Sequence, residues 1–227
     1  MPLWLGEKVQ AVLRAHESRP VSAIEAVLFD WGGVLQRTVD RASREALAAE
    51  VGRRPNELEE AVFGHSLWGL ASVGGLSVER LWACICRDIG WPEGRAPELV
   101  SRFFAGDRVD QRIVELIETL RASSTPVALL SNAPPPFKPA GHAGRWGFSE
   151  LFDDQVFSFE LGVQKPDARA FRGALARLGW RPERTVFVDD AAANVVAAHK
   201  LGMAAIHYSG TEALIDSLAR LELPHHA

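Results

Sequence analysis

Short runs of apolar residues alternate along this chain with stretches in which apolar residues recur every three or four positions. The short runs are typical of buried strands, and they lie at 26–29, 126–130, 185–188 and 204–208, with a weaker run at 155–159. Helical periodicity follows several of these runs. Strands that alternate with helices are typical of a parallel sheet covered by helices on both faces. We therefore predict an α/β fold with a doubly wound, Rossmann-like and mainly parallel sheet.

Residues that favour helix ends mark several boundaries of the predicted helices. Ser77, Asp110 and Thr211 each open a helical pattern, and their side-chain oxygens can accept a hydrogen bond from a main-chain N–H of the first turn. Gly202 follows Leu201, the last periodic residue of another helix, where glycine is a favoured C-terminal stop. These residues predict where three helices begin and where a fourth ends.

The stretch from 37 to 108 differs from the rest, because it contains helical patterns but no good strand. Several glycines punctuate it, as expected for short helices joined by turns. Trp68, Trp82 and Trp91 lie in this stretch and either form its own core or line a substrate pocket. We interpret it as a helical domain inserted between the first two strands of the sheet.

These patterns divide the chain into three parts. Residues 25–36 and 109–227 form the predicted Rossmann-like core domain, and residues 37–108 form the inserted helical cap domain. Residues 1–24 are predicted to be an N-terminal helical extension with one apolar side. That side either packs within its own chain or mediates a homodimer.

Polar side chains follow three of the predicted strands at the point where each strand ends. Asp30 follows the first strand, Ser131 and Asn132 follow the second, and Asp189 and Asp190 follow the third. In an open α/β sheet, ligands bind beyond the carboxyl ends of the strands. We therefore expect these side chains to converge on one site.

Carboxylates dominate this predicted site, and they repel one another in a crevice of low effective dielectric. A divalent cation and the ammonium of Lys165, which stands before a proline and a predicted helix, can compensate that charge. Oxygen ligands with room for water suit magnesium. An aspartate beside the cation can attack a dianionic phosphate as a nucleophile. The pattern predicts phosphoryl transfer through an aspartyl-phosphate on Asp30.

Four short motifs, taken in their order, resemble those of the haloacid dehalogenase superfamily, a large group of aspartate-nucleophile phosphatases and their relatives. The motifs are FDWGGVL at 29–35, LLSN at 129–132, KPD at 165–167 and FVDDAAAN at 187–194. The resemblance extends from residue 26 to residue 208. It implies the fold predicted above, with the inserted helices as a mobile cap that closes over the substrate.

The resemblance also implies a magnesium site. Asp30 is then both the catalytic nucleophile and a magnesium ligand. The main-chain oxygen of Gly32 is a second ligand and Asp190 is a third, while Asp189 helps directly or through a water molecule.

The same resemblance implies a phosphate site beside the metal. Ser131 and Asn132 bind the phosphate, and Lys165 belongs to the catalytic set because it balances the phosphate charge. Asn194 is interpreted as a structural residue that orients the acidic loop. A small phosphorylated metabolite is the expected substrate.

The usual second aspartate of the first motif is missing. Most phosphatases of this family carry it two residues after the nucleophile, where this chain has Gly32. A positioned general acid or base contributes roughly 100- to 10,000-fold, so we expect slow turnover. The rate should fall least for anomeric, acyl and aryl phosphates, because their leaving groups depart without a proton. His65 and His142 are candidate substitutes for the acid, with solvated surface histidines as the alternative interpretation.

Several functions remain open at this point. The retained Asp30, Lys165, Asp189 and Asp190 favour an active magnesium-dependent phosphatase, with sugar phosphates among its possible substrates. Gly32 favours a catalytically impaired relative that binds a phosphorylated ligand or a partner. A 2-haloacid dehalogenase is less favoured, because that branch carries serines in place of the paired acids. A phospho-receiver module is set aside, because its acid pair precedes the phosphorylated aspartate.

Composition and net charge argue against nucleic acid and membranes as binding partners. The 227 residues are 47% hydrophobic and carry a net charge of −4, which suits one sizeable core and gives no basic pattern for nucleic acid or an anionic membrane. No apolar run approaches the roughly 20 residues of a membrane span, and the first residues lack the apolar region of a secretory signal. We predict a cytoplasmic monomer or homodimer, in which Cys84 and Cys86 stay reduced.

Overall fold

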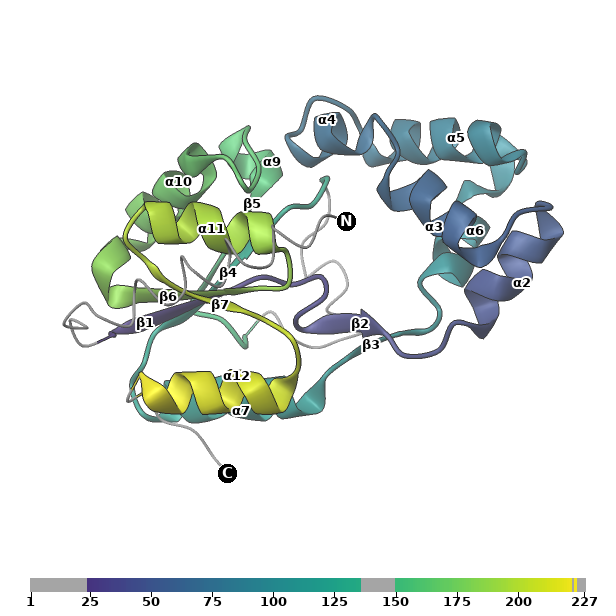
Figure 1. The fold of residues 1–227 in the computed structure, drawn as a ribbon. Coiled ribbons are helices and arrows are strands. Elements are labelled where there is room, and N and C mark those ends of the chain that lie inside the picture. The colour runs from purple at the N-terminus through teal and green to yellow at the C-terminus, as the bar shows by residue number, and fades with distance from the viewer. Residues whose placement is uncertain (1–23, 136–149, 222, 224–227) are drawn as a thin grey trace, which may run out of the picture.

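A five-stranded sheet forms the centre of the molecule in the computed structural model, which describes residues 24–135, 150–221 and 223 (Figure 1). The strand order is β5-β4-β1-β6-β7, and every pair of neighbours is parallel. The strands are β1 (Ala26–Phe29), β4 (Val127–Ser131), β5 (Asp154–Phe157), β6 (Thr185–Asp189) and β7 (Ala204–His207). The predicted parallel α/β sheet is confirmed, and each predicted strand lies within about two residues of its observed position.

Helices cover both faces of this sheet, and their bounds are α7 (Gln111–Ala122), α9 (Ser158–Leu161), α10 (Ala168–Leu178), α11 (Ala192–Lys200) and α12 (Thr211–Arg220), with a 3₁₀ turn at Pro182–Arg184. In Figure 1, α7 and α12 lie below the sheet and α10 and α11 lie above it. Val27 and Phe29 of β1 pack toward one face, while Leu28 packs toward the other. Because a strand alternates its side chains, a fully apolar strand serves two cores at once.

Two of the predicted helix caps are confirmed and one is wrong. Ser77 accepts a hydrogen bond from the N–H of Arg80, and Asp110 accepts one from Arg112. Gly210, rather than Thr211, precedes the first turn of α12. The Thr211 hydroxyl instead donates to Asp110 Oδ2 at 2.9 Å, which ties α12 to the start of α7. A tertiary partner has therefore replaced the local capping bond.

A cluster of short helices, called the helical insert below, projects from one end of the sheet (Figure 1). It consists of α2 (Ala42–Glu50), α3 (Pro55–Phe63), α4 (Trp68–Ser72), α5 (Val78–Ile89), a 3₁₀ turn (Glu93–Arg95) and α6 (Ala96–Phe103). The insert has a hydrophobic core of its own, to which Trp82 and Trp91 belong, while Trp68 packs partly buried against it. These tryptophans therefore stabilise the insert.

A two-stranded antiparallel ribbon connects the insert to the sheet. It pairs β2 (Gln36–Thr38) with β3 (Asp107–Val109). The expectation that 37–108 lacks a strand is wrong at both of its ends. The segments QRT and DRV show no apolar run, because this ribbon is held by main-chain pairing and polar side chains, and Val109 is its one apolar residue, which joins the core beside the sheet.

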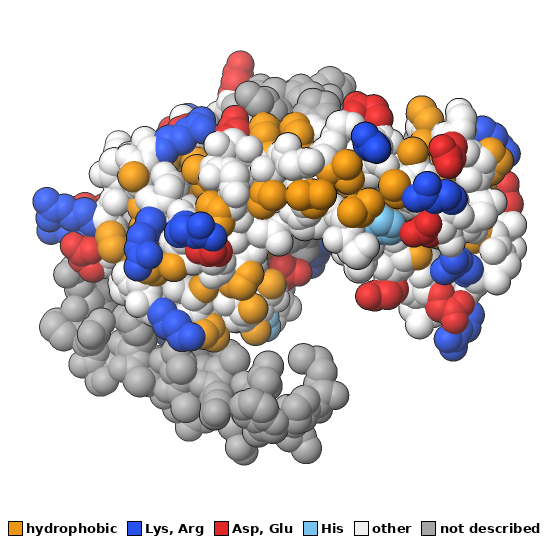
Figure 2. Space-filling model, turned by 90° about the horizontal axis from the view of Figure 1, so that it is seen from above, with side chains coloured by type: hydrophobic (Ala, Val, Ile, Leu, Met, Phe, Trp, Pro, Cys, Tyr) orange, Lys and Arg blue, Asp and Glu red, His pale blue; other side chains and the backbone are white. Residues whose placement is uncertain are grey.

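The far side of the insert touches the core domain a second time. The Ser158 hydroxyl donates to the main-chain oxygen of Ser72 at 2.5 Å, and the N–H of Ala133 donates to the same hydroxyl at 3.0 Å. Seen from above, the core domain and the helical insert form two lobes, and a row of hydrophobic side chains runs across the region that joins them (Figure 2). The surface is hollowed between the two lobes. The contact joins α4 to the segment that begins α9.

The helices in the described part of the chain are all too short or too polar to cross a membrane. The predicted N-terminal extension lies outside the described residues.

Candidate active site

Three aspartates meet where β1 and β6 end. These two strands pair with Phe29 opposite Val188, so Asp30 and Asp189 leave the sheet side by side. The N–H of Asp30 donates to the main-chain oxygen of Val188 at 2.9 Å, which fixes this register. Asp190 follows directly, and one carboxylate oxygen from each aspartate lies within 4.8 Å of the others. The predicted convergence of these three residues is observed.

Lys165 binds two of these carboxylates. Its Nζ donates to Asp30 Oδ1 and to Asp189 Oδ2, both at 2.7 Å. The three side chains are buried, with residue exposures of 2% for Lys165, 8% for Asp30 and 0% for Asp189. Buried charges at such distances interact strongly, because little water remains to screen them.

The site carries more negative than positive charge. Burial raises the pKa of Asp30 to about 7, with Asp189 adding to the rise and the Lys165 ammonium opposing it. Burial and the neighbouring Asp189 also raise the pKa of Asp190. Burial lowers the pKa of Lys165, but the two carboxylates outweigh it and raise that pKa above its ordinary value. A second cation would stabilise the ionised aspartates.

Asn132 holds Lys165 in place through its main chain. The Asn132 Nδ2 donates to the Lys165 oxygen and the Lys165 N–H donates to Asn132 Oδ1, both at 2.9 Å. Both polar atoms of this side chain are thus engaged by the peptide, so the predicted role of the Asn132 side chain as a phosphate ligand gains no support from the geometry. Sequence reasoning missed this clamp, because its partners are 33 positions apart.

Ser131 ends β4, next to Asn132, and it is buried at the same edge of the sheet as Asp30. Its predicted role in phosphate binding stays a prediction.

Asn194 orients the acidic loop, as predicted. Its Nδ2 donates to both carboxylate oxygens of Asp189 at 3.0 Å, and the N–H of Ala191 donates to Oδ1 at 2.8 Å. Together with Lys165, these donors hold Asp189 in one orientation. Asp190 is the more exposed of the pair and is better able to reach a ligand.

The two glycines after Asp30 differ in what surrounds them. Gly33 has a φ of +77°, and a Cβ there would lie 2.0 Å from Asp190 Oδ2, so both conformation and space require glycine. A Cβ on Gly32 would meet nothing within 4 Å. The close approach of Gly33 to Asp190 was not predicted from the sequence.

The proposed stand-in acids gain no support. The His65 Nε2 lies 3.2 Å from Asp88 Oδ2, and its Nδ1 accepts from the N–H of Leu67 at 3.2 Å. The side chain is buried within the insert, so the alternative of a solvated surface histidine is wrong as well. His142 lies outside the described residues.

The donor set fits magnesium. The converging side-chain donors are carboxylate oxygens, which Mg²⁺ prefers, and the ion needs few protein ligands because it keeps several waters. Asp30 and Asp190 are the side chains that could hold it, and the main-chain oxygen of Gly32 stays a predicted third ligand.

Fold and site together place three aspartates and a lysine at the carboxyl ends of the strands of a parallel α/β sheet. Residues 24–202 match the family model described as haloacid dehalogenase-like hydrolase, and the chain belongs to this family. The family resemblance seen in the four motifs is thereby confirmed.

Curated relatives include phosphatases. The chain is 34% identical over 194 residues to the phosphoserine phosphatase of Thermus thermophilus, covering 75% of this chain and 74% of the relative. It is 26% identical over 200 residues to the sesquiterpene phosphatase astK of Aspergillus oryzae, covering 87% and 93%. The chain is therefore a hydrolase of the phosphatase type.

Solved structures share the fold at lower identity. A predicted haloacid dehalogenase-like hydrolase from Porphyromonas gingivalis superposes with a TM-score of 0.66 at 24% identity, covering 88% of this chain and 98% of the other. A family enzyme from Bacteroides thetaiotaomicron, solved with magnesium and inorganic phosphate, gives a TM-score of 0.61 at 20% identity, covering 81% and 93%.

Proposed function

We propose that this enzyme is a magnesium-dependent phosphatase of small phosphorylated metabolites, with Asp30 as its nucleophile. The observation that carries the proposal is the placement of one buried ammonium between Asp30 and Asp189, with Asp190 alongside. The relatives named for phosphoserine and for glyceraldehyde 3-phosphate support a small phosphorylated substrate. A sugar phosphate belongs to this class.

Asp30 performs the chemistry in two steps. Its carboxylate forms a bond to phosphorus while the bond from phosphorus to the leaving oxygen breaks, and the leaving group takes up a proton from solvent. Water then attacks the phosphorus of the aspartyl-phosphate, releases inorganic phosphate and restores the Asp30 carboxylate. Lys165 orients Asp30 through Oδ1 and neutralises charge. When bound, magnesium supplies positive charge for the phosphoryl oxygens.

We propose that the helical insert, residues 37–108, acts as a cap over the substrate. The core domain then consists of residues 25–36 and 109–227. The hollow between the two lobes supports this division (Figure 2). A cap that excludes water strengthens the electrostatic interactions inside a site.

Chelation of magnesium tests the proposed function directly. Wild-type protein should release phosphate from p-nitrophenyl phosphate with Mg²⁺ present, and excess EDTA should lower the rate at least about 100-fold, because a bound cation contributes several kcal/mol to the transition state. Anomeric and aryl phosphates should be better substrates than alkyl phosphates. Equal rates with and without EDTA would contradict metal dependence. A protein that binds Mg²⁺ and phosphate analogues yet turns over nothing would instead be a binding protein.

The open space at Gly32 allows the missing acid to be restored. Gly32→Asp should raise kcat/KM for an alkyl phosphate by about 100-fold and change that for p-nitrophenyl phosphate much less, because only the poor leaving group needs a proton. Gly32→Asn has nearly the same size without an acid and is the matched control. If both variants gave the same ratio of alkyl to aryl rates, Gly32 would not account for the leaving-group preference.

A further inference from the structure

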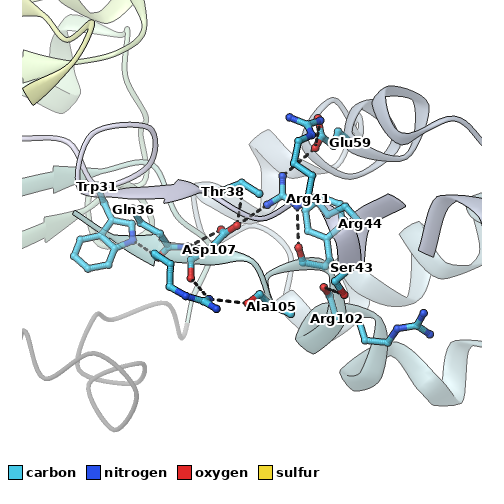
Figure 3. A network of polar contacts seen from close by, with 12 residues as sticks. Trp31, Gln36, Thr38, Arg41, Ser43, Arg44, Glu59, Arg102, Ala105 and Asp107 are labelled. Atoms are coloured by element: carbon cyan, nitrogen blue, oxygen red, sulfur yellow. Dashed lines mark hydrogen bonds and ion pairs between the residues drawn. The ribbon is translucent and has the colours of Figure 1, made fainter. Parts of the chain in front are cut away.

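A series of side-chain contacts joins the loop after Asp30 to the helical insert (Figure 3). The Trp31 indole Nε1 donates to Gln36 Oε1 at 2.8 Å. The Gln36 Nε2 donates to Asp107 Oδ2 at 2.9 Å, and Arg44 Nη2 donates to Asp107 Oδ1 at the same distance. The contacts therefore run from the candidate catalytic loop, through β2 and β3, to α2 of the insert.

Arg44 is fixed firmly at the insert end. Its Nε donates to the main-chain oxygen of Phe103 at 2.8 Å, its Nη1 donates to Glu59, and its guanidinium lies 4.2 Å from the centre of the Phe103 ring. Arg44 and Asp107 are both buried. A buried ion pair contributes little net stability compared with apolar residues, but it specifies one geometry, because losing either partner leaves a charge without water.

Gln36 bonds both to Asp107 and to the loop that follows Asp30. Its main-chain N–H donates to the Trp31 oxygen at 3.0 Å, and its main-chain oxygen accepts from the N–H of Gly33 at 2.9 Å. Trp31 follows Asp30 directly and its ring is buried. The side chain of Gln36 thus fixes the ring of a residue whose main chain sits between Asp30 and Gly32.

We propose that Gln36 and Asp107 are positioning residues for the reaction at Asp30. Asp107 holds the Gln36 side chain, Gln36 holds Trp31, and the turn that carries Asp30 and Gly32 keeps its geometry for that reason. Since Asp107 also binds Arg44, the geometry of this turn depends on where the insert lies. The inference rests on the proposed phosphatase function and extends it to residues outside the site.

Thr38 offers a matched control for the loss of a hydrogen bond. Its hydroxyl donates to Asp107 Oδ1 at 2.8 Å from the same strand as Gln36, whereas the Gln36 side chain also accepts the hydrogen bond from Trp31. Thr38→Val and Gln36→Met each remove one bond to the same carboxylate. A purely structural role predicts similar behaviour for the two variants.

Steady-state kinetics of these variants with p-nitrophenyl phosphate test the proposal. Gln36→Met should lower kcat by about 10- to 100-fold with KM nearly unchanged, because small displacements of reacting groups cost up to about 100-fold. Thr38→Val should stay within about 2-fold of wild type, the level expected of a change that does not reach the loop. Equal kcat values for Gln36→Met and Thr38→Val would overturn the proposal.

A double-mutant cycle isolates the contact between Trp31 and Gln36. Trp31→Phe removes the indole N–H, and the double variant Trp31→Phe/Gln36→Met should be no slower than Gln36→Met alone, because both changes break the same bond. Losses that multiply would mean that the two residues act independently and would contradict the proposal.

Magnesium affinity separates failure of this inference from failure of the proposed function. Absence of phosphate release by wild-type protein would refute the phosphatase function. The positioning role could still be tested, because titration calorimetry with Mg²⁺ alone measures the metal affinity of each variant. Gln36→Met should then weaken Mg²⁺ binding about 10-fold, as outer-shell changes commonly do, and Thr38→Val should not. Equal affinities of the two variants would overturn the positioning role by this second measurement.

Discussion

Asp30→Asn should lower phosphate release by at least about 10⁴-fold, the order of loss seen when a nucleophile is removed from an active site. Asparagine keeps the shape of the side chain and an acceptor for Lys165, but it cannot form an acyl phosphate. Burial raises the pKa of Asp30 to about 7, so the folded protein without metal disfavours the charged form. A neutral side chain of the same shape should therefore leave the protein folded.

This prediction is tested by measuring the rate of phosphate release and the melting temperature of three proteins. Wild type, Asp30→Asn and Asp216→Asn are compared at matched magnesium, since Asp216 is an exposed residue of α12 outside the site and undergoes the same chemical change. Asp216→Asn should behave like wild type. Retention of more than a few per cent of wild-type turnover by a folded Asp30→Asn protein would exclude this carboxylate as the nucleophile.

Lys165→Met should be the most destabilising single change at the site. Its ammonium bonds to both Asp30 and Asp189, and its removal leaves two buried carboxylates facing each other. Breaking a buried ion pair by removing one partner costs about 3–5 kcal/mol of unfolding free energy. Turnover should fall at the same time, because the charge that faces the phosphate is lost.

Urea unfolding with EDTA and with saturating Mg²⁺ measures this effect. The loss of stability should be largest in EDTA and smaller with Mg²⁺, since a divalent cation replaces part of the missing positive charge. Lys200→Met, at the exposed end of α11, is the control for removing a lysine. The double variant Lys165→Met/Asp189→Asn should regain part of the lost stability. An unfolding free energy unchanged in Lys165→Met would show that the buried charges are balanced in another way.

The strands of the sheet were predictable because each of them is a short apolar run in the sequence. Runs such as AVLF and TVFV have apolar side chains toward both faces, and polar residues begin where the strands leave the core. The convergence of Asp30, Asp189 and Asp190 followed from strand direction alone. Local pattern and overall topology agree in this part of the chain.

Other parts of the site depend on contacts between distant positions. Gln36 and Asp107 are 71 residues apart, and neither lies in a run that indicates a strand. The clamp of Asn132 on Lys165 likewise joins separate segments, so its motif position suggested a phosphate ligand instead. A single sequence indicates which chemistry is present, but it does not reveal which polar side chains become partners when they are buried.

The helical insert contacts the core domain at two places, and the two connections differ in kind. At one end, the insert joins the sheet through two covalent chain crossings that form a paired ribbon. At the other end, a contact between α4 and the core passes through the hydrogen bond from Ser158 to the Ser72 oxygen. Any movement that swings α4 away from the core must break this bond, whereas the chain connections of the ribbon stay intact. Because the Ser158 hydroxyl also accepts a hydrogen bond from the N–H of Ala133, two residues beyond Ser131, one side chain contacts both the insert and the segment that follows β4.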